Sequence, residues 1–171
     1  MRGVDSGRLA DVQRLLAAPA VVPNDQNNAG QSALMYACRR GRWEYAKALL
    51  QSGAAVNLRQ RKGGASAAWI LVGRTGNVEM LAALVKEFGA DLTIVDDAGR
   101  TLLHEAASRG RKRVVEWLVN RPELDASAKD EEGRTALDEA KANPNARPEI
   151  AAKLKEATRK RRRKGEEEKG L

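Results

Sequence analysis

The amino-acid sequence predicts an all-α protein in which short helix-turn-helix units stack into a solenoid. Three observations support this fold class: a motif that recurs every 34 or 35 residues, an aromatic content of only 4%, and many alanine and leucine residues at apolar positions. Small aliphatic side chains let helices pack closely. With 171 residues, 42% of them hydrophobic, the chain is large enough to bury a core.

The repeat is marked by a glycine that precedes a longer amphipathic segment. It occurs at Gly7, Gly41, Gly76 and Gly110, and apolar residues follow each glycine at helical spacing. About ten residues before each of the last three glycines begins a shorter apolar segment: SALMYACRRG at 32–41, AAWILVGRTG at 67–76 and TLLHEAASRG at 101–110. A related segment, TALDEAKANP, occupies 135–144.

Each short segment follows a polar turn, and Ser32, Thr101 and Thr135 stand where a residue would cap the helix. The sequence therefore predicts that each unit consists of a turn, a short helix, a glycine turn and a longer helix. Such a unit cannot bury its apolar face alone, so the units must stack. We expect a half-repeat over 1–29, repeats over 30–63, 64–98 and 99–132, and a capping repeat over 133–157. The basic and then acidic tail over 158–171 is expected to lack regular structure.

The segment TLLHEAASRG resembles the T-P-L-H-x-A signature of the ankyrin repeat family, with Leu102 replacing the proline. GADL at 89–92 and GAAVN at 53–57 are similar to the G-A-D-V-N helix exit of that family. The resemblance extends from about Gly7 to Ala157. It implies stacked helix pairs with turn or β-hairpin fingers, and a non-catalytic protein–protein interaction module acting as an adaptor or as a subunit of a larger assembly.

Two repeats depart from this pattern. In the repeat at 64–98, Ala67 takes the capping position, Ile70 takes the histidine position, and the turn at Gly63 and Gly64 has one extra residue. This repeat is expected to be irregular. In the last repeat, Asp138 replaces the histidine and Pro144 replaces the glycine, which predicts that the stack ends there.

The chain contains a single histidine, His104, and a single cysteine, Cys38. The resemblance implies that the His104 ring links neighbouring turns by hydrogen bonds and that Glu105 points outward. A nucleophile triad needs a base with a partner, and a zinc site needs three or four ligands, more than these two residues supply. We therefore expect no catalytic residue, metal site, cofactor or small-molecule substrate, and Cys38 is expected to be a buried small apolar residue.

Basic residues dominate the face that binds partners in the family that the chain resembles, namely the turn tips and the exposed side of the first helix. This surface carries eight basic and three acidic residues, so we expect a partner protein with an acidic surface or segment. Surface arginines that only confer solubility are the alternative. The predicted partner-binding residues are Arg39, Arg40, Arg61, Lys62, Arg74, Arg100, Arg109 and Arg134, with Trp117 as an aromatic anchor on the outer face.

Six consecutive basic residues near the C-terminus, Arg159, Lys160, Arg161, Arg162, Arg163 and Lys164, precede an acidic triplet. Such a run is typical of a nuclear import signal, an RNA contact or a solvated tail. The alternative function is therefore a nucleic-acid-associated component of a ribonucleoprotein particle, with phosphate contacts from the basic face and tail. The lone cysteine, and the lack of an apolar run near the roughly 20 residues that span a bilayer, predict an intracellular protein, cytoplasmic or nuclear, without membrane insertion.

Overall fold

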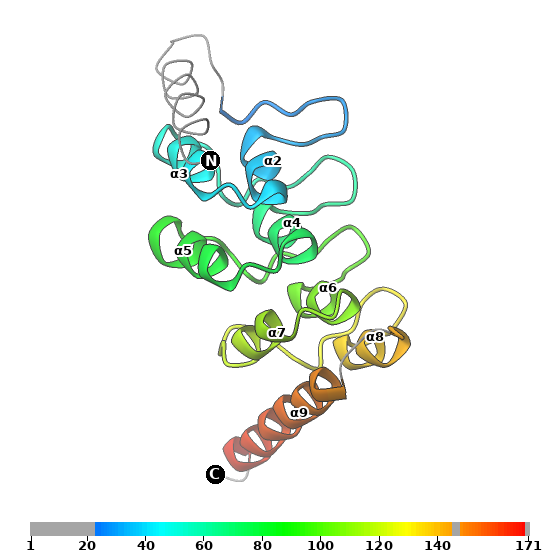
Figure 1. Cartoon of the computed structure of the whole chain (residues 1–171). Helices are drawn as coiled ribbons and strands as arrows, with labels where there is room; N and C mark the ends of the chain where they lie inside the picture. Colours follow the sequence, from blue (N-terminus) through cyan, green and yellow to red (C-terminus); the bar gives the residue numbers. More distant parts are fainter. Residues whose placement is uncertain (1–22, 145–147, 170–171) are drawn as a thin grey trace.

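The computed structural model describes residues 23–144 and 148–169, which form one stack of helix pairs (Figure 1). The column of inner helices comprises α2 Ala33–Arg40, α4 Ala67–Arg74, α6 Leu102–Ser108 and α8 Ala136–Ala142. The outer helices are α3 Trp43–Gln51, α5 Val78–Phe88 and α7 Lys112–Leu118, and α9 Pro148–Lys169 packs against α7 and α8 at the end of the stack. The predicted all-α repeat solenoid is confirmed. The half-repeat expected over 1–29 falls mostly outside the described residues.

The inner helices begin where a hydroxyl side chain meets the free backbone amides of the first turn. The hydroxyls of Ser32, Ser66 and Thr135 each accept a hydrogen bond from the N–H three residues later, at 3.3 Å. Gly41 caps the C-terminus of α2, and its left-handed φ of 65° suits a residue without a β-carbon. Capping residue and glycine together fix the length of this inner helix.

The predicted capping residue of α4 was wrong. Ser66, rather than Ala67, caps this helix, and Trp69 rather than Ile70 then stands at the position that His104 occupies in α6. Counting back from Gly76 misaligned the helix, because this repeat has one more residue between its two N-caps. The N-cap of α5 follows that of α4 by 11 positions, whereas the N-cap of α7 follows that of α6 by 10.

The turns between repeats form fingers that contact one another in sequence. The Asp96 N–H binds the Arg100 carbonyl across one finger, and the Asp130 N–H binds that of Arg134 across the next. The finger around Gly63 is longer by one residue, since its closing bond joins Gln60 to Ala65. Neighbouring fingertips are linked by backbone hydrogen bonds, Asp97 to Gly63 and Glu131 to Ala98. The last finger has an isolated antiparallel bridge between Lys129 and Thr135.

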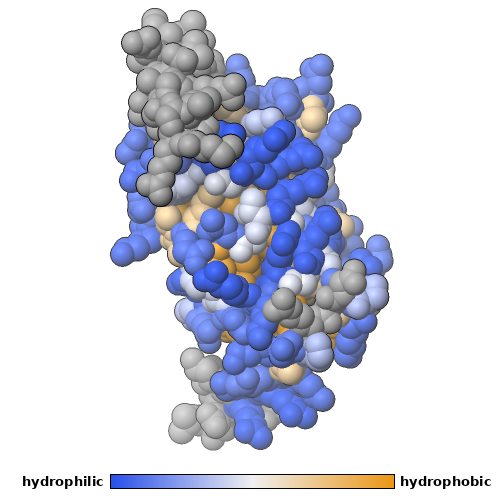
Figure 2. Space-filling model, in the orientation of Figure 1, coloured by the Kyte–Doolittle hydropathy of each residue, from blue (hydrophilic) through white to orange (hydrophobic). Residues whose placement is uncertain are grey.

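The core lies between the inner and outer helices and runs along the stack. Leu71, Leu81, Leu84 and Leu118 are fully buried in it, and the alanines of the inner helices allow close contact between repeats. Figure 2 shows that hydrophilic residues cover most of the visible face, with the strongest hydrophobic colour in its middle. The burial therefore follows the apolar periodicity of the sequence.

Helix α9 replaces the outer helix of the last repeat and continues far beyond it. Ile150 and Leu154 are buried against the stack, and they fix the first half of the helix. The prediction that residues 158–171 lack regular structure was wrong, because α9 extends to Lys169. Arginine, lysine and glutamate favour helix, and a helix already nucleated by packing is easily propagated. Arg161 also donates a hydrogen bond to the Pro122 carbonyl at 3.2 Å.

Candidate partner-binding site

Stacking of the inner helices places equivalent residues in rows along one face. Tyr36, Ile70, Glu105 and Glu139 each stand four positions after their capping residue, and they make up one row. Arg40, Arg74 and Arg109 stand eight positions after it and make up a second row, as the repeat spacing predicts. The first row is therefore apolar in the first two repeats and acidic in the last two, and the second row is basic.

A pocket of about 190 Å³ opens on this face between α2, α4 and α6. Trp69 and Ile70 supply its apolar wall, and Gly73 leaves room at its base. Arginine side chains from three successive repeats surround it: Arg39, Arg74 and Arg109. Sequence reasoning missed Trp69 and Ile70 as lining residues, although counting forward from Ser66 would have placed them beside the arginines.

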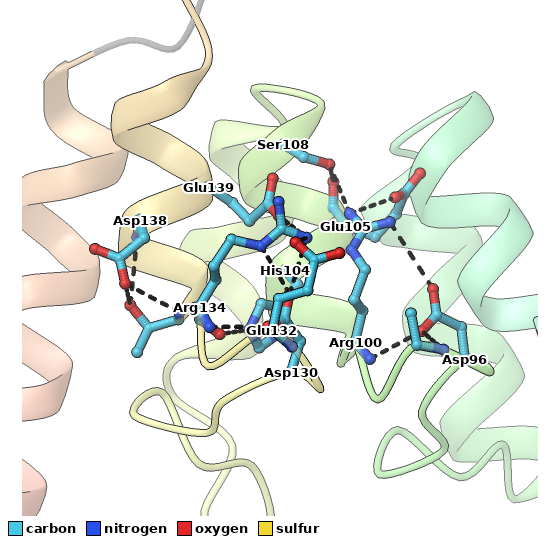
Figure 3. Close-up of polar contacts among 12 residues, drawn as sticks. Asp96, Arg100, His104, Glu105, Ser108, Asp130, Glu132, Arg134, Asp138 and Glu139 are labelled. Atoms are coloured by element: carbon cyan, nitrogen blue, oxygen red, sulfur yellow. Dashed lines mark hydrogen bonds and ion pairs between the residues drawn. The ribbon is translucent and has the colours of Figure 1, made fainter.

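Glu105 is buried at the edge of this pocket, and the expectation that it points outward was wrong. It is only 1% exposed, and its carboxylate lies 2.9 Å from Nε of Arg109 and 3.3 Å from an Nη of Arg100 (Figure 3). The carboxylate fits because Gly73 of the preceding repeat has no side chain, and a β-carbon there would collide with Glu105 Oε1. Two of the predicted binding arginines are therefore engaged within the protein.

Arg134 is engaged in the same way by the last finger and α8. Its guanidinium pairs with Asp130 at 3.1 Å, with Glu132 at 3.3 Å and with Glu139 at 3.4 Å (Figure 3). Burial would raise the pKa of Asp130, but hydrogen bonds from the backbone and guanidinium of Arg134 outweigh it and hold that pKa below its usual value. This end of the face carries carboxylates that offset its basic residues.

The other five predicted basic residues form no ion pair with any of the described residues. Arg39 and Arg40 come from α2, Arg61 and Lys62 from the following finger, and Arg74 from α4. Arg40 lies over the ring of Tyr36, 5.2 Å from its centroid, and Tyr36 is 52% exposed. We call these five residues, with Tyr36, Trp69 and Ile70, the basic groove. Its positive charge is concentrated in the first two described repeats, whereas the sequence suggested four.

His104 has the structural role that the resemblance implies. Its ring is fully buried, Nδ1 accepts a hydrogen bond from the Thr101 N–H at 3.2 Å, and Nε2 lies 2.9 Å from the Arg134 carbonyl. Because a carbonyl only accepts, Nε2 carries a proton and donates it to the Arg134 carbonyl. Nδ1 is thus engaged with the capping residue of α6, and Nε2 joins α6 to the next finger.

Trp117 does not lie with the groove arginines, because it belongs to the outer helix α7. It is half-buried, and the Arg121 guanidinium lies 3.8 Å from the centroid of its ring. Residues Arg159 to Arg163 of the basic run are exposed on α9, at the end of the stack. The structure thus separates the predicted binding residues into two regions.

Cys38 is fully buried, and burial raises the pKa of its thiol to about 12. Within residues 23–144 and 148–169, no group of three or more His, Cys, Asp or Glu residues could hold a metal ion. No helix in the described part of the chain has the length and apolar character needed to cross a membrane.

These features define a helical repeat protein with a positively charged groove on one face. A family model described as "Ankyrin repeats (many copies)" matches residues 68–119, and one described as "Ankyrin repeat" matches residues 29–61. The chain belongs to the ankyrin repeat family, whose repeats are protein–protein interaction modules and are generally non-catalytic. The predicted resemblance is confirmed.

Individual relatives share only part of the chain. It is 41% identical over 70 residues to a protein described as "Putative glutaminase 2" of Caenorhabditis elegans, which covers 41% of this chain and 11% of that protein. It is 47% identical over 47 residues to "Inhibitor of Bruton tyrosine kinase" of Xenopus laevis, which covers 27% of this chain and 4% of that protein. The matched segments thus make up only a small part of the length of either relative.

Proposed function

We propose that this protein is a non-catalytic adaptor, or a subunit of a larger assembly, that binds an acidic segment of a partner protein in the basic groove. The observation that carries the proposal is the set of five basic residues without an ion pair to any described residue, gathered beside exposed Tyr36 and the pocket of Trp69 and Ile70. Arginine forks pair with carboxylates in two-point geometry, and aromatic side chains contribute strongly at interfaces.

The predicted binding arginines outside the basic groove support this location of the binding site, because their charges are already neutralised. Arg100, Arg109 and Arg134 already hold carboxylates of the protein itself, so an acidic partner gains little from them. Arg39, Arg40 and Arg74 carry a charge that a partner carboxylate can satisfy. Binding would therefore centre on α2, α4 and the finger between them.

Affinity capture from the native source, followed by mass spectrometry, tests the proposal. The wild type is compared with the double variant Arg40→Glu, Arg74→Glu, which reverses two groove charges without touching a buried carboxylate. The matched control is Lys86→Glu, Lys155→Glu, at two exposed lysines on α5 and α9 that pair with no described residue. We expect the groove variant alone to lose a protein partner.

Nuclease treatment before capture separates this function from the nucleic-acid alternative. A protein partner that stays bound after treatment supports the adaptor. Partners that all disappear with the nucleic acid would support the ribonucleoprotein role instead, in which the basic face and tail contact phosphate.

A further inference from the structure

A second cleft, distant from the basic groove, lies between the segment that follows α7 and the middle of α9. Its volume is about 300 Å³. Val119, Leu124 and Ala126 from the segment and Ala157 from α9 form its apolar wall. Leu124 and Ala126 are buried in the core, while Val119 and Ala157 are partly exposed. The cleft therefore offers a hydrophobic wall that a partner side chain can reach.

The rim of the cleft is basic. Arg121, Lys160 and Arg161 line it, and none of the described residues that line it is acidic. Arg121 is held over the Trp117 ring at 3.8 Å, a cation–π contact that positions its guanidinium. Arg161 is anchored by its bond to the Pro122 carbonyl and lies 4.0 Å from Asp125. The two arginines are thus pre-positioned, which lowers the entropy cost of binding.

The positive surface continues along α9 beyond the cleft. Arg159, Arg162 and Arg163 are exposed on the same and the following turn of the helix. Part of this charge is offset within the protein, since Arg161 lies 4.0 Å from Asp125 and Lys160 pairs with Glu156 at 2.7 Å. Charge complementarity therefore favours an anionic occupant, and the apolar wall favours one that also carries a hydrophobic side chain.

We propose that this cleft binds a short acidic peptide segment of a partner protein, with one aliphatic or aromatic side chain against the apolar wall and flanking carboxylates paired with Arg121 and Arg161. A peptide fits better than a nucleic acid, because base stacking needs an open aromatic face and Arg121 already covers the Trp117 ring. The cleft is independent of the basic groove, so a protein with both sites would bridge two acidic segments.

Fluorescence anisotropy with a labelled peptide tests the proposal on the full chain. The probe carries a Leu-Phe pair flanked by glutamates, and two control probes carry glutamine in place of glutamate or serine in place of the Leu-Phe pair. We expect saturable binding of the first probe only. The indole N–H signal of Trp117 in an NMR spectrum should shift when the probe is added, while that of Trp69 should not.

Two variants locate the site. Ala157→Phe fills the cleft without a change of charge, and Arg121→Glu reverses one rim charge. Each should weaken binding about tenfold or more, which corresponds to a loss of at least about 1.4 kcal/mol. The matched controls are Ala152→Phe and Lys155→Glu, both on exposed positions of α9. Circular dichroism confirms that each variant is folded.

Several results would overturn the proposal. The first is loss of probe binding in the groove variant Arg40→Glu, Arg74→Glu with retention in Arg121→Glu, which would place the peptide in the groove. The others are binding that tolerates serine in place of the Leu-Phe pair, displacement of the probe by polyuridylate at equal charge, or no saturable binding by the wild type. A failure here leaves the groove test unaffected, because the two sites use different residues.

Discussion

The carboxylate of Glu105 is buried beneath the groove with Nε of Arg109 at 2.9 Å, in space left free by Gly73 of the preceding repeat. This contact joins two repeats and removes one arginine from the set available to a partner. Replacement of a helical glycine by alanine usually stabilises a protein, but at Gly73 this contact should make the same replacement destabilising.

Gly73→Ala should destabilise the protein by about 1 to 3 kcal/mol, because the added methyl group collides with the Glu105 carboxylate and displaces it from its arginines. Without this contact, the same change within a helix would be stabilising by about 0.5 to 1 kcal/mol. Urea unfolding measures the difference. In the background of Glu105→Ala the cost should largely vanish, and an equal cost in both backgrounds would show that the contact is unimportant.

His104→Ala should lower the free energy of unfolding by about 1 to 2 kcal/mol, since it removes the link between Thr101 and the Arg134 carbonyl. Thermal denaturation followed by circular dichroism measures the effect. An unchanged melting temperature would mean that the ring does not hold the fingers together, and would reopen the question of a chemical role.

Asp130→Asn should destabilise the protein at neutral pH and lose its effect in acid. Because the folded-state pKa of Asp130 lies below its ordinary value, its ionised form stabilises the folded protein above the unfolded-state pKa, about 3.9. That contribution disappears as the pH falls through the lower folded-state pKa. Unfolding curves of both proteins should therefore converge at low pH, and a constant difference at all pH values would contradict the ion pair with Arg134.

Cys38 should resist alkylation by iodoacetamide in the folded protein at neutral pH and react readily in denaturant. Burial withholds the thiol from the reagent and raises its pKa to about 12, so very little reactive thiolate is present. Mass spectrometry of timed samples measures the labelled fraction. Rapid labelling without denaturant would show that α2 opens or that the thiol is accessible.

Much of the fold could be predicted from local signals in the sequence. The capping residues Ser32 and Thr135 act within a few residues of the chain, and short motifs mark the glycines and the histidine of each unit. The structure contains these features as expected. The misalignment of α4 came from a single extra residue, which a local pattern does not place.

The charge of the site could not be predicted in the same way. Glu105 looks like a surface carboxylate in its own helix, and its burial depends on Gly73, which lies in another repeat. Arg134 likewise meets Glu139 of α8 only after folding. Counting charges along the sequence therefore overestimated the positive face, because pairing between side chains is set by their three-dimensional neighbours.

A charge-swap measurement tests the basic groove most directly. Once a captured partner is mapped to an acidic segment, its affinity is measured by calorimetry for the wild type, for Arg40→Glu, Arg74→Glu and for the control Lys86→Glu, Lys155→Glu. We expect the groove variant to weaken binding at least about a hundredfold, since several kcal/mol are lost when like charges meet. Lysines in place of the acidic residues of the partner should then restore much of the affinity to that variant alone. Equal affinity for the groove variant and the control, or no recovery with the lysine-substituted partner, would contradict recognition of an acidic segment by the groove.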